Sequence, residues 1–198
     1  MIIGLTGGMG CGKSTAAALF AGHGFTRFDA DQVVREELLP MLDVVAAVRG
    51  KFGDAVIGPD GQIQRDRLAE IVFRDEAALA WLEGELHPRL NALWRARFAA
   101  ARGEKFIVEV PLLFEKGMEN WFDFTVCVTT DSALQIRRLE QRGIPPELAR
   151  QRLAKQLPLA RKCELADFVL LNDGSLEFLS EQVSALAHRL LQPQPACP

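Results

Sequence analysis

The sequence predicts an α/β fold in which helices cover both faces of a parallel sheet, and three observations support this prediction. Five short apolar, β-branched segments read as strands, helical patterns separate most of them, and a glycine-rich loop joins the first strand to the first helix. With 198 residues, 48% of them hydrophobic and 25% charged, the chain is long enough for one sizeable core or a core with a small lobe.

The strands are expected at residues 2–6, 25–28, 106–110, 124–128 and 168–171. Helices are expected at residues 13–21, 133–142 and 176–191, where apolar residues recur at helical spacing. Because strands that alternate with helices pair in parallel, we expect one five-stranded sheet in a three-layer arrangement.

One interval interrupts the alternation. Residues 32–103 are mainly helical, with apolar residues three and four positions apart. A crossover connection needs only about a dozen residues, so we interpret this interval as an inserted helical lobe with a task of its own. The nucleotide-binding core would then comprise residues 1–31 and 104–191, and the proline-rich residues 192–198 read as a flexible tail.

The charge and the cysteines exclude several classes of protein. The formal net charge of −3 provides no electrostatic footprint for nucleic acid or for an anionic membrane. The N-terminal apolar stretch is too short for a signal peptide or a membrane span. The four cysteines, Cys11, Cys127, Cys163 and Cys197, are scattered, which argues against a zinc ribbon or a disulfide framework. We therefore expect a cytoplasmic protein with reduced thiols.

The loop at residues 7–15, GGMGCGKST, contains the pattern GxxxxGK[ST] with Gly7, Gly12, Lys13 and Ser14 in the required positions. The pattern follows a predicted strand and opens a predicted helix, the context in which it indicates a phosphate-binding loop. Backbone N–H groups can wrap a triphosphate only where no Cβ intervenes. Lys13 would bridge the β- and γ-phosphates of ATP, and the Ser14 hydroxyl would bind Mg²⁺. A glycine turn with a solvated lysine is the alternative.

Asp31, in the DAD sequence at residues 29–31, comes where the second strand is expected to end. Carboxyl ends of parallel strands meet at one edge of the sheet, so its carboxylate is expected beside the loop. There it would orient an attacking hydroxyl and accept its proton, although positioning dominates in phosphoryl transfer. A turn or helix-capping aspartate is the alternative.

Together these residues and several further motifs resemble the dephospho-coenzyme A kinase family over nearly the whole chain, to about residue 190. The resemblance implies a P-loop NTPase-type fold and ATP-dependent phosphorylation of the ribose 3′-hydroxyl of dephospho-coenzyme A. The matching segments are GLTGGMGCGKST, FDADQVVRE, GQIQRDRLAEIVF, LHPRL, VPLLFE, IRRLEQRG and ADFVLLNDG.

The resemblance also implies roles for individual residues. Asp31 would face the acceptor hydroxyl, and Asn172 would lie near the adenine. The ATP-binding residues would be Gly8, Gly10, Cys11, Gly12, Lys13, Ser14 and Thr15, and the substrate-binding residues Arg65, His87, Leu112, Leu113, Phe114 and Glu115. Without the resemblance, Arg65 reads as a solvated charge, His87 as a packed or capping histidine, and the PLLF segment as plain core.

Arg138 and Arg142 are expected on one face of the helix at residues 133–142. In a member of this family that helix belongs to a lid, at about residues 137–160, whose arginines close on the transferring phosphate and make Arg138 a catalytic residue. An exposed basic face is the alternative.

Two residues near the loop raise separate questions. A thiol at a helix N-terminus beside Lys13 is expected to have a lowered pKa, so Cys11 would react with oxidants, unless it is an inert buried thiol. Glu109, in the third predicted strand, occupies the region of a possible metal-supporting acid, but we do not expect it to be essential because the position varies in the family that the chain resembles.

Two other functions remain compatible with the loop: a nucleotide-dependent switch, and a kinase for another small molecule such as a nucleoside monophosphate. A guanine-nucleotide switch is disfavoured because no NKxD motif is present. We expect ATP and dephospho-coenzyme A as substrates, Mg²⁺ as the metal, and a monomer or weak homo-oligomer.

Overall fold

The computed structural model describes residues 1–101 and 103–192, which form two compact units. The core unit joins Met1–Asp29 to the chain from Gly103 onward, and the helical lobe begins at Ala30 and ends before Gly103. The predicted insertion has its borders at residues 32 and 103. Residues 193–198, which belong to the predicted tail, lie outside the described residues.

The core unit is built on a sheet whose strands all run parallel in the order β2-β3-β1-β4-β5. Every predicted strand is present, with its ends displaced by no more than one residue. The predicted α/β fold with a parallel five-stranded sheet is therefore confirmed. The strands are β1 (Ile2–Gly7), β2 (Thr26–Asp29), β3 (Phe106–Glu109), β4 (Phe124–Thr129) and β5 (Phe168–Leu171).

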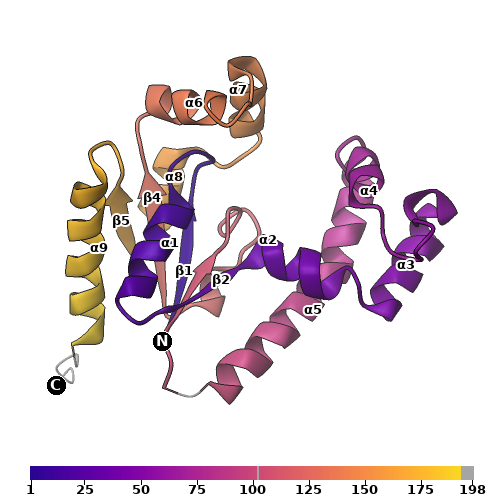
Figure 1. Cartoon of the computed structure of the whole chain (residues 1–198), viewed down its shortest axis with the longest axis horizontal. Coiled ribbons are helices and arrows are strands. Elements are labelled where there is room, and N and C mark those ends of the chain that lie inside the picture. Colours follow the sequence, from indigo (N-terminus) through magenta and orange to yellow (C-terminus); the bar gives the residue numbers. More distant parts are fainter. Residues whose placement is uncertain (102, 193–198) are drawn as a thin grey trace. The chain divides into compact units, whose positions relative to one another are not determined.

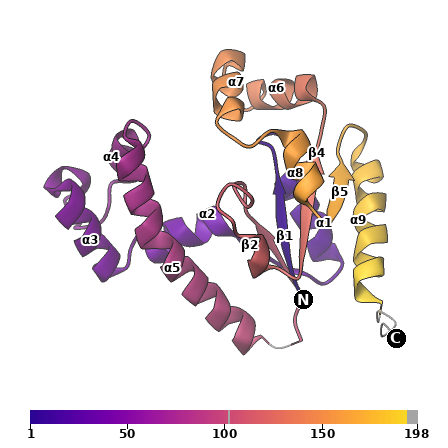
Figure 2. The same cartoon turned by 180° about the vertical axis from the view of Figure 1, so that it is seen from behind.

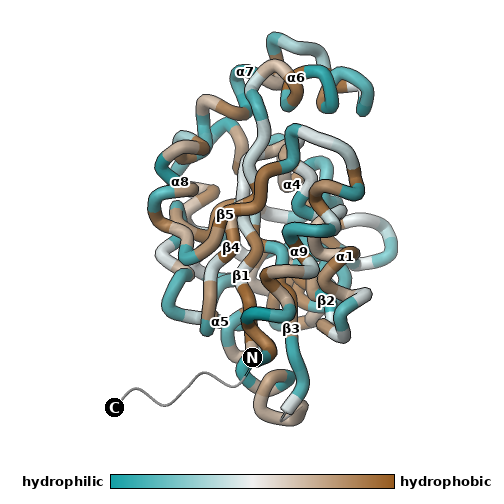
Figure 3. Tube along the Cα trace, turned by 90° about the vertical axis from the view of Figure 1, so that its left-hand side faces the viewer, coloured by the Kyte–Doolittle hydropathy of each residue, from teal (hydrophilic) through white to brown (hydrophobic). Residues whose placement is uncertain are grey.

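Helices cover both faces of this sheet. Helices α1 (Lys13–Gly22) and α9 (Leu176–Leu191) lie on one face and α8 (Leu159–Leu165) on the other (Figures 1 and 2). On the first face, Ile3 and Leu5 of β1 pack with Phe20 of α1 and Val183 of α9, all fully buried. In Figure 3, where the Cα trace is coloured by hydropathy, hydrophobic residues are seen along β1 and β4. Burial on both faces explains why these strands are continuously apolar.

The predicted lid region contains two short helices, α6 (Ser132–Glu140) and α7 (Pro146–Ala154). Asp131 caps α6 by accepting hydrogen bonds from the N–H groups of Ala133 and Leu134. The helix ends at Glu140, and Gly143 follows in the left-handed region with φ of 80°. The prediction of a helix to residue 142, with Arg138 and Arg142 on one face, is wrong at its end, because Arg142 lies in the exposed turn.

The lobe is helical, as predicted. Its longest element, α5, runs unbroken through Pro88 and buries a stripe of residues four positions apart. None of the helices within residues 1–101 and 103–192 is long and apolar enough to cross a membrane. The elements of the lobe are α2 (Ala30–Val33), the π-helical turn η1 (Val34–Leu38), α3 (Leu42–Phe52), the 3-10 turn η2 (Asp54–Val56), α4 (Arg65–Val72) and α5 (Glu76–Ala100).

Candidate active site

The loop between β1 and α1 depends on glycines in unusual backbone conformations. Gly10 and Gly12 have φ angles of 85° and 93°, in the left-handed region. A Cβ atom on Gly12 would lie 2.2 Å from Nδ2 of Asn172, so no side chain fits there. Gly12 directly precedes the first residue of α1, which brings the loop N–H groups to the positive end of the helix. The loop therefore has the construction of an anion cradle.

The Lys13 side chain lies over this loop. Its ammonium group donates hydrogen bonds to the carbonyl oxygens of Gly7 and Gly8, at 3.1 Å each. Ser14 and Thr15, in the first turn of α1, are exposed. The structure thus places a cation and a row of backbone N–H groups in one continuous turn, where a triphosphate can be held.

Ser14 is part of a polar chain that crosses to the neighbouring strands. Its hydroxyl donates to Oε2 of Glu109 at 2.8 Å, and the Glu109 carboxylate is almost completely buried at the end of β3. Oε1 of Glu109 accepts from Nε of Arg27 at 2.7 Å and from a terminal guanidinium nitrogen at 2.6 Å. Sequence reasoning passed over Arg27. Its position inside a short strand, where a charged residue needs a partner, could have marked Arg27 as a functional candidate.

Asn172 anchors the other side of the loop. Its side-chain amide donates to the backbone carbonyl oxygen of Cys11 at 2.7 Å. Its backbone carbonyl oxygen accepts from Nη2 of Arg138 at 3.0 Å. The second terminal nitrogen of Arg138, Nη1, is buried and has no hydrogen-bond partner among the described residues. An unsatisfied guanidinium N–H costs free energy, which a bound anion would recover.

A second bond ties the lid to the loop. The Gln135 side chain of α6 donates to the carbonyl oxygen of Met9 at 2.9 Å, and Gln135 is buried. Sequence reasoning missed this residue because a single glutamine in a helix carries no distinctive signal. The contact places the first half of α6 directly against the phosphate loop.

The expectation that the Cys11 thiol has a lowered pKa is wrong. Its side chain is fully buried in the core cluster. Burial raises the pKa of the Cys11 thiol, and nearby Lys13 offsets only part of that rise. Burial likewise raises the pKa of Cys127, whose Sγ lies 3.8 Å from Sγ of Cys163. Cys11 therefore contributes its backbone to the loop, and its side chain to the core.

The PLLFE segment after β3 divides between core and surface. Leu113 is fully buried, which corrects its expected contact with substrate, whereas Leu112 and Phe114 are partly exposed. Glu115 forms an ion pair at 2.7 Å with Lys162 of α8, a lysine that is completely buried. Lys162 was missed from sequence, since a lysine in a helix normally lies at the surface.

The remaining predicted substrate residues belong to the helical lobe. Asp31 is exposed in α2, two residues beyond the end of β2, so the chain has already left the strand. Arg65 is exposed at the start of α4. His87 is partly buried inside α5, so it does not cap a helix.

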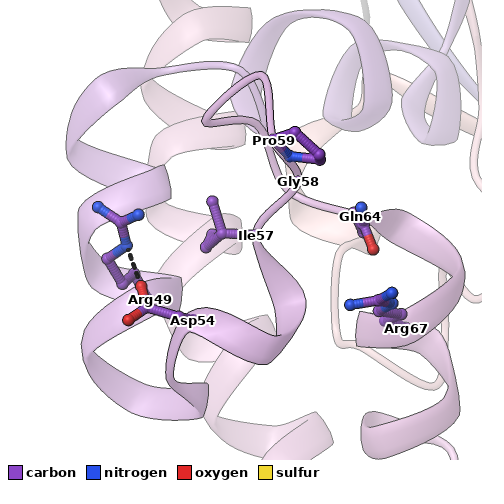
Figure 4. Close-up of a pocket in the computed structure, with 7 residues that line it drawn as sticks. All are labelled: Arg49, Asp54, Ile57, Gly58, Pro59, Gln64 and Arg67. Carbon is purple, nitrogen blue, oxygen red and sulfur yellow. Dashed lines mark ion pairs between the residues drawn. The ribbon is translucent and has the colours of Figure 1, made fainter.

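The lobe has a cavity of its own, of about 450 Å³ (Figure 4). Two arginines line it: Arg49 pairs with Asp54 at 2.8 Å, and Arg67 donates to the carbonyl oxygen of Ala55 at 3.0 Å. Both cations therefore bind oxygens of η2, and they brace the connection between α3 and α4. The full lining is Arg49, Asp54, Ile57, Gly58, Pro59, Gln64 and Arg67.

The donor set around Ser14 fits a magnesium ion that arrives with phosphates. No group of three or more His, Cys, Asp or Glu side chains in the described part of the chain is arranged to hold a metal alone. Mg²⁺ takes oxygen ligands and is commonly held by one or two protein groups, substrate phosphates and water. A serine hydroxyl beside a buried carboxylate suits that mode of binding.

Comparison with known families and sequences connects this geometry to one activity. The model of the dephospho-CoA kinase family matches residues 1–177. A dephospho-CoA kinase from Leifsonia xyli subsp. xyli is 41% identical over 190 residues, which cover 93% of this chain and 96% of the relative. The dephospho-CoA kinase of Corynebacterium glutamicum is 39% identical over 193 residues, with 96% of each chain covered.

Solved structures agree with the sequence relatives. A Thermus thermophilus protein superposes with a TM-score of 0.84 at 33% identity, over 97% of this chain and 98% of its own. Dephospho-CoA kinase from Campylobacter jejuni has a TM-score of 0.71 at 26% identity, with 96% of each chain covered. A shikimate kinase from Bacteroides thetaiotaomicron, with a TM-score of 0.55 at 18% identity over 96% of this chain and 98% of its own, shares the fold.

Proposed function

The chain belongs to the dephospho-CoA kinase family, and we propose which of its residues carry out the reaction of that family. ATP phosphorylates the ribose 3′-hydroxyl of dephospho-CoA and gives coenzyme A and ADP, the last step of coenzyme A biosynthesis. The observation that carries the residue assignment is the glycine loop, whose backbone and lysine form an anion cradle at the start of α1.

ATP binds with its phosphates in the loop of residues 7–15. The N–H groups of the loop donate to phosphate oxygens, and the Lys13 ammonium moves from the loop carbonyls to the β- and γ-phosphates. Charge on the transferring phosphoryl group is thereby neutralised by groups of the loop itself. Asn172 holds the loop through its bond to the Cys11 carbonyl, and it is the proposed neighbour of the adenine.

Ser14 is the proposed protein ligand of Mg²⁺. Its hydroxyl proton is directed to Glu109, so the oxygen lone pairs remain available. When bound, the metal would neutralise the negative charge that develops on the phosphates during transfer. Glu109 acts by orienting the hydroxyl, which gives it a larger part than sequence reasoning assigned.

Asp31 is proposed to orient the 3′-hydroxyl and accept its proton. The lobe is the proposed binding site for the rest of dephospho-CoA, with Arg65 and His87 as polar contacts. Leu112, Phe114 and Glu115 are the proposed substrate contacts of the core unit. The Leu113 side chain is buried and packs in the core of that unit. Positioning of the two reactants supplies most of the acceleration in such a transfer.

Arg138 is the proposed lid arginine that contacts the transferring phosphoryl group. Its unpartnered Nη1 and its bond to Asn172 support this role. Arg142, in the turn after α6, is a peripheral contact for the same nucleotide. Closure of α6 and α7 excludes water, which would otherwise hydrolyse ATP.

Product identification tests the proposal and separates its alternatives. Incubation with ATP, Mg²⁺ and dephospho-CoA is expected to yield coenzyme A and ADP in equal amounts, measured by liquid chromatography with mass detection. Nucleoside monophosphates and shikimate are expected to remain unphosphorylated. Turnover of one of those acceptors in place of dephospho-CoA, or a preference for GTP, would contradict the proposal.

The state of the protein in the cell is also a proposal. We propose a cytoplasmic monomer or weak homo-oligomer with small-molecule substrates and without a nucleic-acid or membrane partner; the net charge of −3 supports this. Sedimentation at several protein concentrations checks the assembly state.

A further inference from the structure

Arg27 forms an ion pair with Glu109, the residue that accepts a hydrogen bond from the proposed metal ligand Ser14. Arg27 of β2 places two guanidinium nitrogens on Oε1 of Glu109, at 2.7 and 2.6 Å. The other oxygen, Oε2, accepts the Ser14 hydroxyl at 2.8 Å. Both oxygens of the buried carboxylate are therefore engaged, one by a positive charge and one by the serine.

The register of the sheet explains how three residues distant in sequence meet. Glu109 stands beside Leu5 of β1 and Asp29 of β2, while Arg27 stands beside Ile107, two residues earlier on β3. Residues two apart on a strand share a face, so Arg27 and Glu109 point to the same side. That side is covered by α1, whose first turn carries Ser14.

A buried carboxylate requires a compensating cation. Glu109 has 5% of its side-chain surface exposed, whereas Arg27 has 39%, so the guanidinium closes the carboxylate off on its solvent side. A Mg²⁺ ion dehydrates reluctantly and needs several oxygen ligands. With Arg27 on Oε1, Ser14 and Glu109 offer the metal one neutral hydroxyl and a carboxylate whose charge is already balanced.

We propose that Arg27 is an internal counter-ion of Glu109 that makes metal binding depend on nucleotide. Mg²⁺ then enters together with the triphosphate, which supplies the oxygens and the negative charge that Arg27 has cancelled on the protein. Arg27 is a positioning residue, because it acts on the metal through Glu109 and Ser14. The inference rests on the proposed ATP- and Mg²⁺-dependent function.

Removal of the guanidinium has two opposing effects on the metal. Ser14 loses part of its orientation, which typically weakens a metal site 10–100-fold. The buried carboxylate is also left without a counter-ion, which favours a divalent cation at that position. We expect the loss of the counter-ion to outweigh the loss of Ser14 orientation. The Arg27 guanidinium contacts the Glu109 carboxylate directly, and the divalent metal that would replace it carries twice its charge.

Metal titration of the nucleotide-free protein tests the proposal. Mn²⁺ replaces Mg²⁺, and electron paramagnetic resonance measures the free ion. We expect weak binding to wild type, binding at least about tenfold tighter to Arg27→Met, and an intermediate value for Arg27→Lys, which keeps the charge but loses the planar fork. The matched control is Arg161→Met, which breaks an exposed ion pair with Glu164 in the same unit and should leave metal binding unchanged.

The double variant Arg27→Met with Glu109→Gln assigns the effect to the pair. It should bind Mn²⁺ as weakly as wild type, since the uncompensated carboxylate is gone. Equal Mn²⁺ affinity in wild type and Arg27→Met, or a gain that persists in the double variant, would overturn the inference. If Arg27→Met does not fold, Arg27→Lys carries the same comparison.

Calorimetry with Mg·ATP on the same proteins separates this inference from the proposed function. If wild type does not bind Mg·ATP, the proposed function fails. If wild type binds Mg·ATP, and Arg27→Met and Arg27→Lys bind free Mn²⁺ with the affinity of wild type, only the proposed role of Arg27 fails.

Discussion

Neighbouring side chains in the phosphate loop differ sharply in exposure. Cys11 is fully buried, Lys13 is half-buried, and Ser14 and Thr15 are exposed. The difference arises because the chain turns at the edge of the sheet, so the Cys11 side chain points into the core and the Ser14 and Thr15 side chains point to solvent. The chemistry of each side chain follows from that direction rather than from its type.

Cys11 is expected to be inert. Because burial raises the pKa of its thiol, little thiolate exists at neutral pH and the reagent has no access. Treatment of the folded protein with iodoacetamide at pH 8, followed by peptide mass mapping, should show Cys11 unmodified and the partly exposed Cys163 modified first. Protein unfolded in urea is the control, in which both react; rapid modification of Cys11 in the folded protein would refute the prediction.

Asp31→Asn is expected to slow phosphoryl transfer by about 100-fold or more, the usual scale for an acid–base group. The affinity for ATP should change by less than about twofold, because the proposed role of Asp31 is toward the acceptor hydroxyl. Single-turnover kinetics and calorimetry measure the two quantities. Glu70→Gln, an exposed acid of α4, is the control. Comparable losses in transfer and ATP affinity would count against the role of Asp31.

Lys162 supports the PLLFE segment from within the core unit. Its ammonium group donates to the Pro111 carbonyl at 2.8 Å and pairs with Glu115 at 2.7 Å. Lys162→Met should lower the free energy of unfolding by about 3–5 kcal/mol, because it leaves the Glu115 carboxylate without a counter-ion, with only the Leu157 N–H still donating to it.

Urea denaturation measures that loss. The double variant Lys162→Met with Glu115→Gln should recover part of it, since no unpaired charge remains. A double variant as unstable as Lys162→Met alone would show that the ammonium group acts through the Pro111 carbonyl, not through the ion pair.

Among the elements, helix ends and interruptions place the functional groups. Gly143 stops α6 and leaves Arg142 in a turn, so of the two predicted lid arginines only Arg138 is carried by the helix that bonds to the loop. In the lobe, α5 continues for 25 residues although Pro88 lies inside it. Tertiary packing of the buried stripe outweighs the local cost of the proline.

Pro88→Ala is expected to stabilise α5. Proline lacks the N–H group that would bond to the Gly84 carbonyl, and a proline in a helix interior costs about 3 kcal/mol. Pro88 is exposed, so alanine loses little packing. Amide hydrogen exchange should show stronger protection along α5, and the transition temperature should rise. Pro145→Ala, at the N-cap of α7 where no N–H group is needed, should have little effect. Unchanged protection in Pro88→Ala would contradict this account.

At the scale of the whole molecule, the residues of the proposed ATP site and most residues of the proposed acceptor site belong to different units. The core unit contains the phosphate loop, the Ser14–Glu109–Arg27 chain and the lid helices. The helical lobe contains Asp31, Arg65 and His87. Each substrate should therefore leave its own pattern of protection.

Hydrogen exchange with each ligand separately tests this division. Mg·ATP should protect residues 7–15 and the first turns of α6, and raise the unfolding temperature through mass action. Dephospho-CoA should protect peptides of α4 and α5. EDTA is expected to remove most of the ATP-dependent protection. Protection of the lobe by ATP alone, with none by dephospho-CoA, would reverse the proposed assignment.

The sequence by itself determined the local features. The GxxxxGK[ST] pattern, the five strands and the helical insertion follow from the spacing of glycines and apolar residues, which is short-range information. The order and spacing of the motifs along the chain were also enough to indicate the correct family.

Only the tertiary structure decided which side chains are buried and which are paired. Arg27 and Glu109 meet because β2 and β3 are neighbours in register, whereas the side chains of Cys11 and Leu113 are buried in the core. Burial and ion pairing depend on residues distant in the chain, which no local pattern records. That is the physical reason why the strand–loop–helix arrangement was predicted correctly and the burial of Cys11 was not.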